Sequence, residues 1–223
     1  MSVVHHQREM PAAPTDFGTV QGLLRTRLYS TESAGADVVR RVVAPGLMQR
    51  VLIDQGGTAL PVTYDLLRRW PITEFDLFAL AERNVRATDD LRVDMHEVLD
   101  PGLPPLALLT GAEYLTAHVR WLGEQPVLGP EGAVLTLPSQ RAVFVYPVVG
   151  PEIVSSAQVL AQFAAESFAK EPALINPWVY WWHRGRLDLA ATVRNGDDGP
   201  QLYPTSQFAD FVTRLGGDAS WGA

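Results

Sequence analysis

The amino-acid sequence predicts an α+β fold, with a mainly antiparallel sheet and helices chiefly on one face. Two apolar hairpins supply strands of the sheet: the one at residues 129–151 is expected at its centre, and the one at residues 176–193 is expected further out, covered on one face only. Helical patterns at residues 71–87, 152–170 and 205–215 supply the helices. With 47% hydrophobic residues in a chain of 223, we expect one sizeable core and one compact unit with peripheral additions.

The N-terminal end carries no periodic pattern. Residues 1–18 are predicted to form a flexible leader, because Pro11, Pro14 and Gly18 interrupt any periodicity. Residues 19–223 are then predicted to form a single α+β domain.

A strand pair is predicted next. Residues 47–54 are rich in β-forming side chains and end at a turn signal, residues 55–57, so residues 58–63 can return as a second short strand. Three nearby segments are short or ambiguous: residues 19–30 and 38–43 as strand or helix, and residues 64–70 as one or two helical turns.

The clearest helix spans residues 71–87. Thr73 fits its N-cap, and Asp76 can reach back toward the Thr73 amide. Ile72 and Leu77 stand where a hydrophobic staple would lie. Further along, the pattern predicts strands at residues 91–100 and 105–111, and a helix at residues 112–122 that stops at Gly123.

Both faces of the hairpin at residues 129–151 are apolar. We expect Leu135 opposite Phe144 and Val134 opposite Val145. Strands that are apolar on both faces are usually central and covered on both sides. After the second hairpin, the pattern predicts a loop at residues 195–200 and a last helix closed by Gly216 and Gly217.

The segment "NPWVYWWHRGRLDLA", residues 176–190, holds three tryptophans and a tyrosine in one short run. A two-residue turn at Arg184-Gly185 gives the hairpin one apolar face, expected in the core, with the pairs Trp182–Leu187, Tyr180–Leu189 and Trp178–Ala191. The other face suits water or a polar partner, with the pairs Val179–Ala190, Trp181–Asp188 and His183–Arg186. Trp181 and His183 are therefore the candidates for exposure and recognition.

Several of these segments, in this order, resemble a known family. They are the helix with "AERNVRA", the hairpin "LTLPSQRAVFVYPV", the long helix after it and the hairpin "WVYWWHRGRLDLA". Over roughly residues 47–193 the chain is similar to the YtpQ-like family of bacterial proteins of unknown function. The resemblance implies an α+β fold and brings no known activity or catalytic residues.

Composition excludes several classes of function. The formal net charge of −7 disfavours nucleic acid and anionic membrane surfaces as partners. The chain has no cysteine, which excludes disulfides, thiolate metal sites and cysteine nucleophiles. No apolar run approaches the roughly 20 residues of a membrane span, and the first residues lack the apolar core of a signal peptide. We therefore expect a soluble cytoplasmic protein.

No cofactor, metal or catalytic motif is predicted. The segment "HEVLD" is similar to a helical His-Glu-x-x metal-binding motif. On a strand, however, His96 and Asp100 would lie about 13 Å apart, too far to bind one metal ion. The glycines of residues 53–58 lack the Gly-Lys-Ser/Thr ending of a phosphate loop, and the chain has no Gly-x-Ser-x-Gly elbow. The acidic loop at residues 195–200 lacks the alternating spacing of a calcium site.

One pair has acid/base character. Asp188 can orient the His183 imidazole for proton transfer, and Arg184 and Arg186 beside them can hold an anion. We expect a non-enzymatic interaction module that docks an unknown protein partner, or a second copy of itself, on the face near Trp181. The alternative is a small-molecule-binding protein or enzyme with a pocket around His183 and Asp188.

Overall fold

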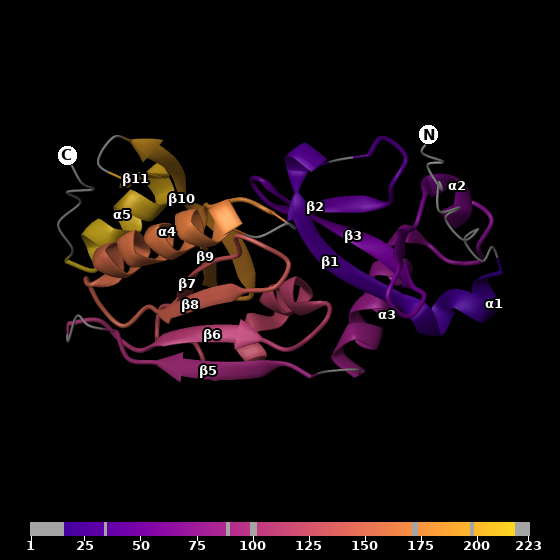
Figure 1. Cartoon of the computed structure of the whole chain (residues 1–223), viewed down its shortest axis with the longest axis horizontal. Helices are drawn as coiled ribbons and strands as arrows, with labels where there is room; N and C mark the ends of the chain where they lie inside the picture. The colour runs from indigo at the N-terminus through magenta and orange to yellow at the C-terminus, as the bar shows by residue number, and fades with distance from the viewer. Residues whose placement is uncertain are drawn as a thin grey trace, which may run out of the picture.

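The computed structural model has an α+β fold built on two antiparallel sheets, as predicted (Figure 1). It describes residues 16–33, 35–87, 90–98, 102–170, 174–196 and 199–216. A four-stranded sheet comes from the N-terminal part of the chain, and a seven-stranded sheet comes from the rest. In Figure 1 the small sheet, in indigo and purple, lies beside the large sheet.

The small sheet has the strand order β1-β3-β2, and β4 also pairs with β3. β3 and β4 are the strand pair predicted around the glycine turn, and the two ambiguous segments before them form β1 and β2. The bounds are β1 (Leu24–Ser30), β2 (Arg40–Ala44), β3 (Leu47–Asp54) and β4 (Ala59–Pro61). Short helical turns flank the sheet: α1 (Phe17–Val20), η1 (Gln21–Leu23), η2 (Thr31–Ser33) and α2 (Tyr64–Leu67).

The flexible leader predicted for residues 1–18 is too long at its C-terminal end. Phe17 and Gly18 belong to α1, because Asp16 caps this turn by accepting a hydrogen bond from the Thr19 amide (2.8 Å). The Phe17 ring also packs against Trp70, with 5.5 Å between the ring centroids. The rest of the predicted leader, residues 1–15, lies outside the described residues.

Helix α3 (Glu74–Ala87) forms where the sequence predicts it. Thr73 caps it by accepting a hydrogen bond from the Asp76 amide (3.1 Å), and the Asp76 carboxylate accepts one from the Thr73 hydroxyl (2.7 Å). Its buried face packs chiefly on β1. This face consists of Leu77, Phe78, Ala81 and Val85.

The large sheet has the strand order β11-β10-β9-β7-β8-β6-β5. Every neighbouring pair of strands is antiparallel, and the predicted hairpin strands β7 and β8 lie near its centre. The bounds are β5 (Arg92–His96), β6 (Leu106–Thr110), β7 (Ala133–Thr136), β8 (Val143–Pro147), β9 (Val179–His183), β10 (Arg186–Gly196) and β11 (Gly199–Pro204).

The predicted register of β7 and β8 is wrong by one residue. Leu135 lies opposite Val145, not Phe144, and Val134 lies opposite Tyr146. The connection between the strands is not a self-contained tight turn, because the Pro138 carbonyl accepts a hydrogen bond from the Ile175 amide (2.9 Å). A segment far along the chain therefore contacts the connection between these two strands.

The predicted loop at residues 195–200 is part of a further hairpin. β10 extends to Gly196, and β11 begins at Gly199 and pairs back along it. Residues 191–196 pair with residues 199–204, so most of the predicted loop is strand. Asp197 and Asp198 lie outside the described residues.

Helices pack on both faces of the large sheet. This differs from the prediction, which placed them chiefly on one face. α4 (Ile153–Lys170) and α5 (Ser206–Arg214) share an apolar cluster with Val134, Tyr146 and Trp181. On the opposite face, η3 (Leu115–Glu124) shares a cluster with Leu135 and Tyr180. Strands β1, β2 and β3 contribute Leu28, Ala44 and Leu47 to this second cluster, so the two sheets share one core.

The helix predicted at residues 112–122 is a 3-10 helix with a break. Trp121 in η3 has non-helical backbone angles (φ −126°, ψ 39°). Its indole Nε1 donates a hydrogen bond to Nδ1 of His118 (3.2 Å), and His118 is fully buried.

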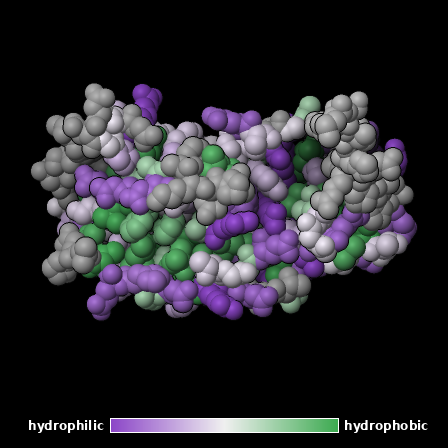
Figure 2. Space-filling view, in the orientation of Figure 1, coloured by the Kyte–Doolittle hydropathy of each residue, from purple (hydrophilic) through white to green (hydrophobic). Residues whose placement is uncertain are grey.

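Part of the α4 face of the large sheet is apolar surface. Figure 2 shows hydrophobic residues gathered between α4 and β5, over β6 and β8. Leu108 and Phe144 lie opposite each other on these strands, and the Phe163 ring of α4 stacks on Phe144 with 5.5 Å between centroids.

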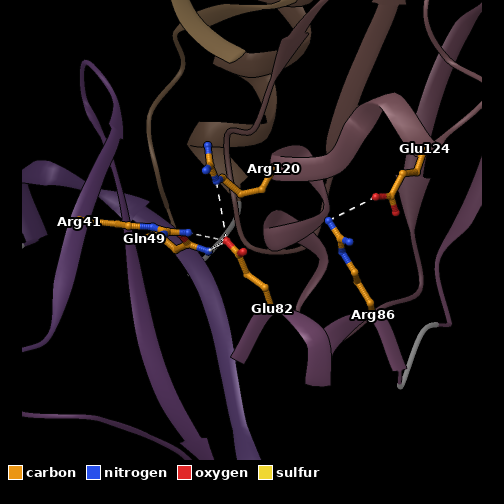
Figure 3. Close-up of polar contacts among 6 residues, drawn as sticks. All are labelled: Arg41, Gln49, Glu82, Arg86, Arg120 and Glu124. Carbon is orange, nitrogen blue, oxygen red and sulfur yellow. Dashed lines mark hydrogen bonds and ion pairs between the residues drawn. The ribbon is translucent and has the colours of Figure 1, made fainter. Parts of the chain in front are cut away.

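A polar cluster around Glu82 joins the small sheet to η3 (Figure 3). The Glu82 Oε1 atom accepts hydrogen bonds from Arg41 of β2 (2.6 Å) and from Gln49 of β3 (2.9 Å). The Arg120 Nε atom of η3 lies 3.9 Å from the same oxygen, and Arg86 pairs with Glu124 nearby. Burial lowers the pKa of the Arg41 guanidinium, and the Glu82 carboxylate opposes this effect.

Replacement of Glu82 by Ala should lower the free energy of unfolding by about 1–3 kcal/mol, because buried Gln49 and partly buried Arg41 lose their shared acceptor and Arg120 loses an ion-pair partner. Urea denaturation measures this loss. Asp65→Ala removes the carboxylate of an exposed ion pair with Arg68 and should cost less than about 1 kcal/mol. Equal losses in the two variants would show that the Glu82 cluster does not stabilise the fold.

A second polar contact joins the two sheets at Tyr180. Its buried hydroxyl donates a hydrogen bond to the Pro45 carbonyl (3.2 Å) and accepts one from Asn176 Nδ2 (2.9 Å). Asn176 Nδ2 also donates to the Gly46 carbonyl (3.2 Å). Burial raises the pKa of the Tyr180 phenol above its usual value, and the hydrogen bond with Asn176 lowers it by less.

This raised pKa predicts a loss of stability at alkaline pH. Above about pH 10 the unfolded chain loses the Tyr180 proton while the folded chain keeps it, so the free energy of unfolding falls as the pH rises. Tyr180→Phe should be about 1 kcal/mol less stable at neutral pH, yet lose less stability between about pH 10 and 11.5. Urea denaturation across this range tests it, with Tyr203→Phe on β11 as the exposed control. A slope for Tyr180→Phe as steep as that of the wild type would contradict it.

Candidate functional site

A pocket of about 790 Å³ opens beside the turn of the aromatic hairpin. We call it the hairpin pocket. It has three walls: the loop at residues 128–132, the end of β9 with the turn at residues 181–184, and α5 with the residue that follows it. The α5 wall presents Gln207, Phe211, Arg214 and Leu215. Its volume lies within the range of pockets that hold small organic ligands.

A stack of three rings forms one side of the hairpin pocket. The Trp181 ring lies between His183, at 3.7 Å between centroids and 14° between planes, and Phe211, at 4.0 Å and 25°. The indole Nε1 donates a hydrogen bond to the Glu131 carbonyl (3.1 Å). All three rings therefore hold one another in place.

The exposure expected for Trp181 is wrong, because only 6% of this residue is accessible to solvent. The face that carries it is covered by α5, whose Phe208 and Phe211 rings pack on the indole. His183 is partly exposed and lines the hairpin pocket.

The hairpin turn has the predicted geometry. Arg184 and Gly185 both have positive φ (49° and 75°), as a two-residue type I′ turn requires. The predicted pairs of His183, Trp182, Trp181 and Tyr180 with their partners on β10 are all present.

Beyond Leu189 the register of this hairpin shifts by a β-bulge. Val179 lies opposite Ala191 instead of Ala190, and Trp178 is not in the ladder. The bulge lies beside the start of α5: the Ala190 carbonyl accepts a hydrogen bond from the Thr205 amide (2.8 Å), and the Leu189 carbonyl accepts one from the Thr205 hydroxyl (3.1 Å).

The predicted acid/base pair is present. His183 Nε2 lies 2.8 Å from Asp188 Oδ2, and Arg186 lies 3.6 Å from the other carboxylate oxygen. Arg184 and His183 line the hairpin pocket. Asp188 and Arg186 line a second, more open pocket of about 480 Å³, with Arg120 and residues 42–45. The five predicted binding residues are thus divided between two pockets that meet at the His183–Asp188 bond.

The loop at residues 128–132 is a tight turn that the sequence analysis did not connect to the site. The Gly129 amide donates to the Gly132 carbonyl (2.9 Å), and the Gly132 amide donates back (3.1 Å). A Cβ atom on Gly132 would lie 2.1 Å from the Trp182 carbonyl oxygen, and one on Gly129 would lie 2.1 Å from that of Val148. Glycine is therefore required at both positions, and the "GPEG" turn is the signal that marks this wall.

The residues of α5 are the other part of the site that sequence reasoning missed. Gln207, Phe211 and Arg214 repeat at helical spacing, which predicts only a helix face. Their arrival at β9 is set by the Thr205 contacts with β10. No local signal indicates this neighbourhood.

The hairpin pocket carries positive charge in an acidic protein. Arg184 and Arg214 are exposed at its edge, and within the described residues we find no ion pair for either guanidinium. Among the described residues that line the pocket, Glu131 is acidic. The nearby Asp188 carboxylate already pairs with His183 and Arg186.

Other candidate chemistry has little support in the described ranges. These residues contain no group of three or more His, Asp or Glu side chains placed to hold a metal ion. His96 lies in β5 as expected, while Asp100, His5 and His6 fall outside the described residues. No described helix is long and apolar enough to cross a membrane.

No protein-family model, curated protein or solved structure matches the chain. The resemblance to the YtpQ-like family therefore stays a prediction.

Trp181→Ala should destabilise the fold by about 3–5 kcal/mol, because it removes a buried indole from between two rings. Phe75→Ala is the control, since Phe75 is 76% exposed on α3, and should change stability by no more than about 0.5 kcal/mol. Chemical denaturation of both variants measures the difference. A small loss in Trp181→Ala would contradict the burial of this ring beneath α5.

Proposed function

We propose that the protein binds a small organic ligand in the hairpin pocket. The observation that carries this proposal is the construction of the pocket from rigid parts. One wall is the glycine-closed turn at residues 129–132, the second is the type I′ turn at Arg184-Gly185, and the third is a capped helix, α5. A pocket with such walls exists before the ligand arrives, so little ordering entropy opposes binding.

The lining has the composition of a binding site. Phe211, Leu128 and Leu215 supply apolar surface, and a small number of polar groups lie among them. The His183–Asp188 pair holds the His183 ring in a fixed orientation through a 2.8 Å hydrogen bond, and Trp181 holds its face. These contacts support recognition of a ligand of defined shape.

The expectation of a protein-docking face rested on Trp181 as an exposed aromatic anchor. Its burial beneath α5 removes that anchor, since an anchor residue must be accessible to bury area against a partner. The pocket alternative is therefore the function that the geometry supports best.

Occupation of the hairpin pocket is tested with a fluorescent apolar probe, N-phenyl-1-naphthylamine, excited directly. Gln207 lies in the first turn of α5 and is exposed at the pocket, so Gln207→Trp should fill the cavity without disturbing the core. Wild type should bind the probe, and Gln207→Trp should bind it at least about tenfold more weakly.

The matched control is Gln158→Trp, which places the same side chain on an exposed position of α4, away from the pocket. It should bind the probe like wild type. Equal affinity in Gln207→Trp and wild type would contradict the proposed function. Equal weakening in both variants would contradict it as well, because the affected probe would not be in the pocket.

A further inference from the structure

We infer that the ligand of the hairpin pocket is an organic anion with an apolar body, held by Arg184 and Arg214. The inference rests on the proposed function and specifies its ligand class. The anionic group can be a carboxylate, a sulfonate or a phosphate, since an arginine side chain recognises all three through paired N–H donors.

The two arginines reach the pocket from different elements. Arg184 is the first of the two central residues of the type I′ turn and has a positive φ. The strand pairs that begin with His183 and Arg186 fix the backbone on both sides of this turn. Arg214 is in the last turn of α5, with its guanidinium carbon 6.0 Å from the centre of the Phe211 ring. They are 30 residues apart in sequence and line the same cavity.

In the part of the chain that the structure describes, no nearby acidic side chain forms an ion pair with Arg184 or Arg214. Asp188 is bonded to His183 and paired with Arg186. Asp210 is one turn before Arg214 on α5, and no ion pair joins the two; nor does one join Glu131 to either arginine of the pocket. An anionic ligand would supply the missing partner, whereas a cation would be repelled.

Arg214 has a second possible role, because a basic residue in the last turn stabilises the negative end of a helix. That role affects the stability of α5 and does not depend on the charge of a bound molecule. A comparison of charged and neutral probes therefore separates the two roles.

The rest of the lining selects an apolar body. Leu128, Phe211 and Leu215 line the same cavity as Arg184 and Arg214. Both faces of the Trp181 ring are already occupied by His183 and Phe211, so the ligand contacts the edges of this stack. A small anion such as inorganic phosphate would leave the apolar part of the pocket unfilled.

The test uses two probes that share one aromatic skeleton. The anionic probe is 1-anilinonaphthalene-8-sulfonate, and the neutral one is N-phenyl-1-naphthylamine. Each is titrated against wild type, Arg184→Ala, Arg214→Ala, the double variant and the pocket-filling Gln207→Trp. Arg69→Ala is the control, because Arg69 is an exposed arginine outside the pocket lining.

Wild type should bind the anionic probe more tightly than the neutral one, and added salt should weaken only the anionic probe. Each single variant should lose about fivefold to tenfold in affinity for the anionic probe, with less than about a twofold change for the neutral probe. Arg69→Ala should match wild type, and Gln207→Trp should weaken both probes.

Equal affinity of wild type for the two probes, or unchanged anionic affinity in the double variant, would overturn the anion inference while leaving the proposed function intact. Failure of Gln207→Trp to weaken either probe would overturn the proposed function itself. A parallel loss of both probes in Arg214→Ala, with lower thermal stability, would assign Arg214 to the helix end only and overturn its role as an anion ligand.

Discussion

The docking of α5 on the aromatic end of β9 is the interaction on which the site depends. Thr205, the N-cap of α5, donates hydrogen bonds to the carbonyls of Leu189 and Ala190, at the β-bulge in β10. Phe208 and Phe211 then fall on Trp181. One helix cap therefore positions a ring stack, a pocket wall and Arg214.

Burial of the rings beneath α5 has a direct consequence for function. Trp181 occupies the centre of the stack and serves to hold His183 and Phe211, so its role is in positioning. The polar groups at the pocket edge are left as the parts that can recognise a ligand. Because they stand on two tight turns and a capped helix, their positions do not depend on the ligand.

The contacts between the two sheets explain why the site is rigid beyond its own walls. Asn176 and Tyr180 tie the start of β9 to the turn between β2 and β3, and Glu82 ties β2 and β3 to η3. Both contacts concern the face of the large sheet opposite α5. The strand that carries His183 is thus held from both sides of the sheet.

The sequence by itself determined the α+β class, the capped helix α3, the central hairpin strands and the pairing of the aromatic hairpin as far as Leu189. These features follow from local rules, because side-chain alternation, caps and glycine turns act within a few residues. The same rules located His183, Asp188 and Arg184 together, since all three lie around one two-residue turn.

The tertiary structure decided which face of that hairpin is covered. Alternation places Trp181 on the other face of the sheet from its neighbour Tyr180, which lies in the core. It cannot indicate that a helix beginning 25 residues further on covers that face. The connection between β7 and β8 is likewise in contact with a distant segment, because the Pro138 carbonyl accepts a hydrogen bond from the Ile175 amide. Contacts between distant segments bring Phe211, Arg214 and Arg184 together in one pocket. The local sequence pattern does not show which distant segments will meet.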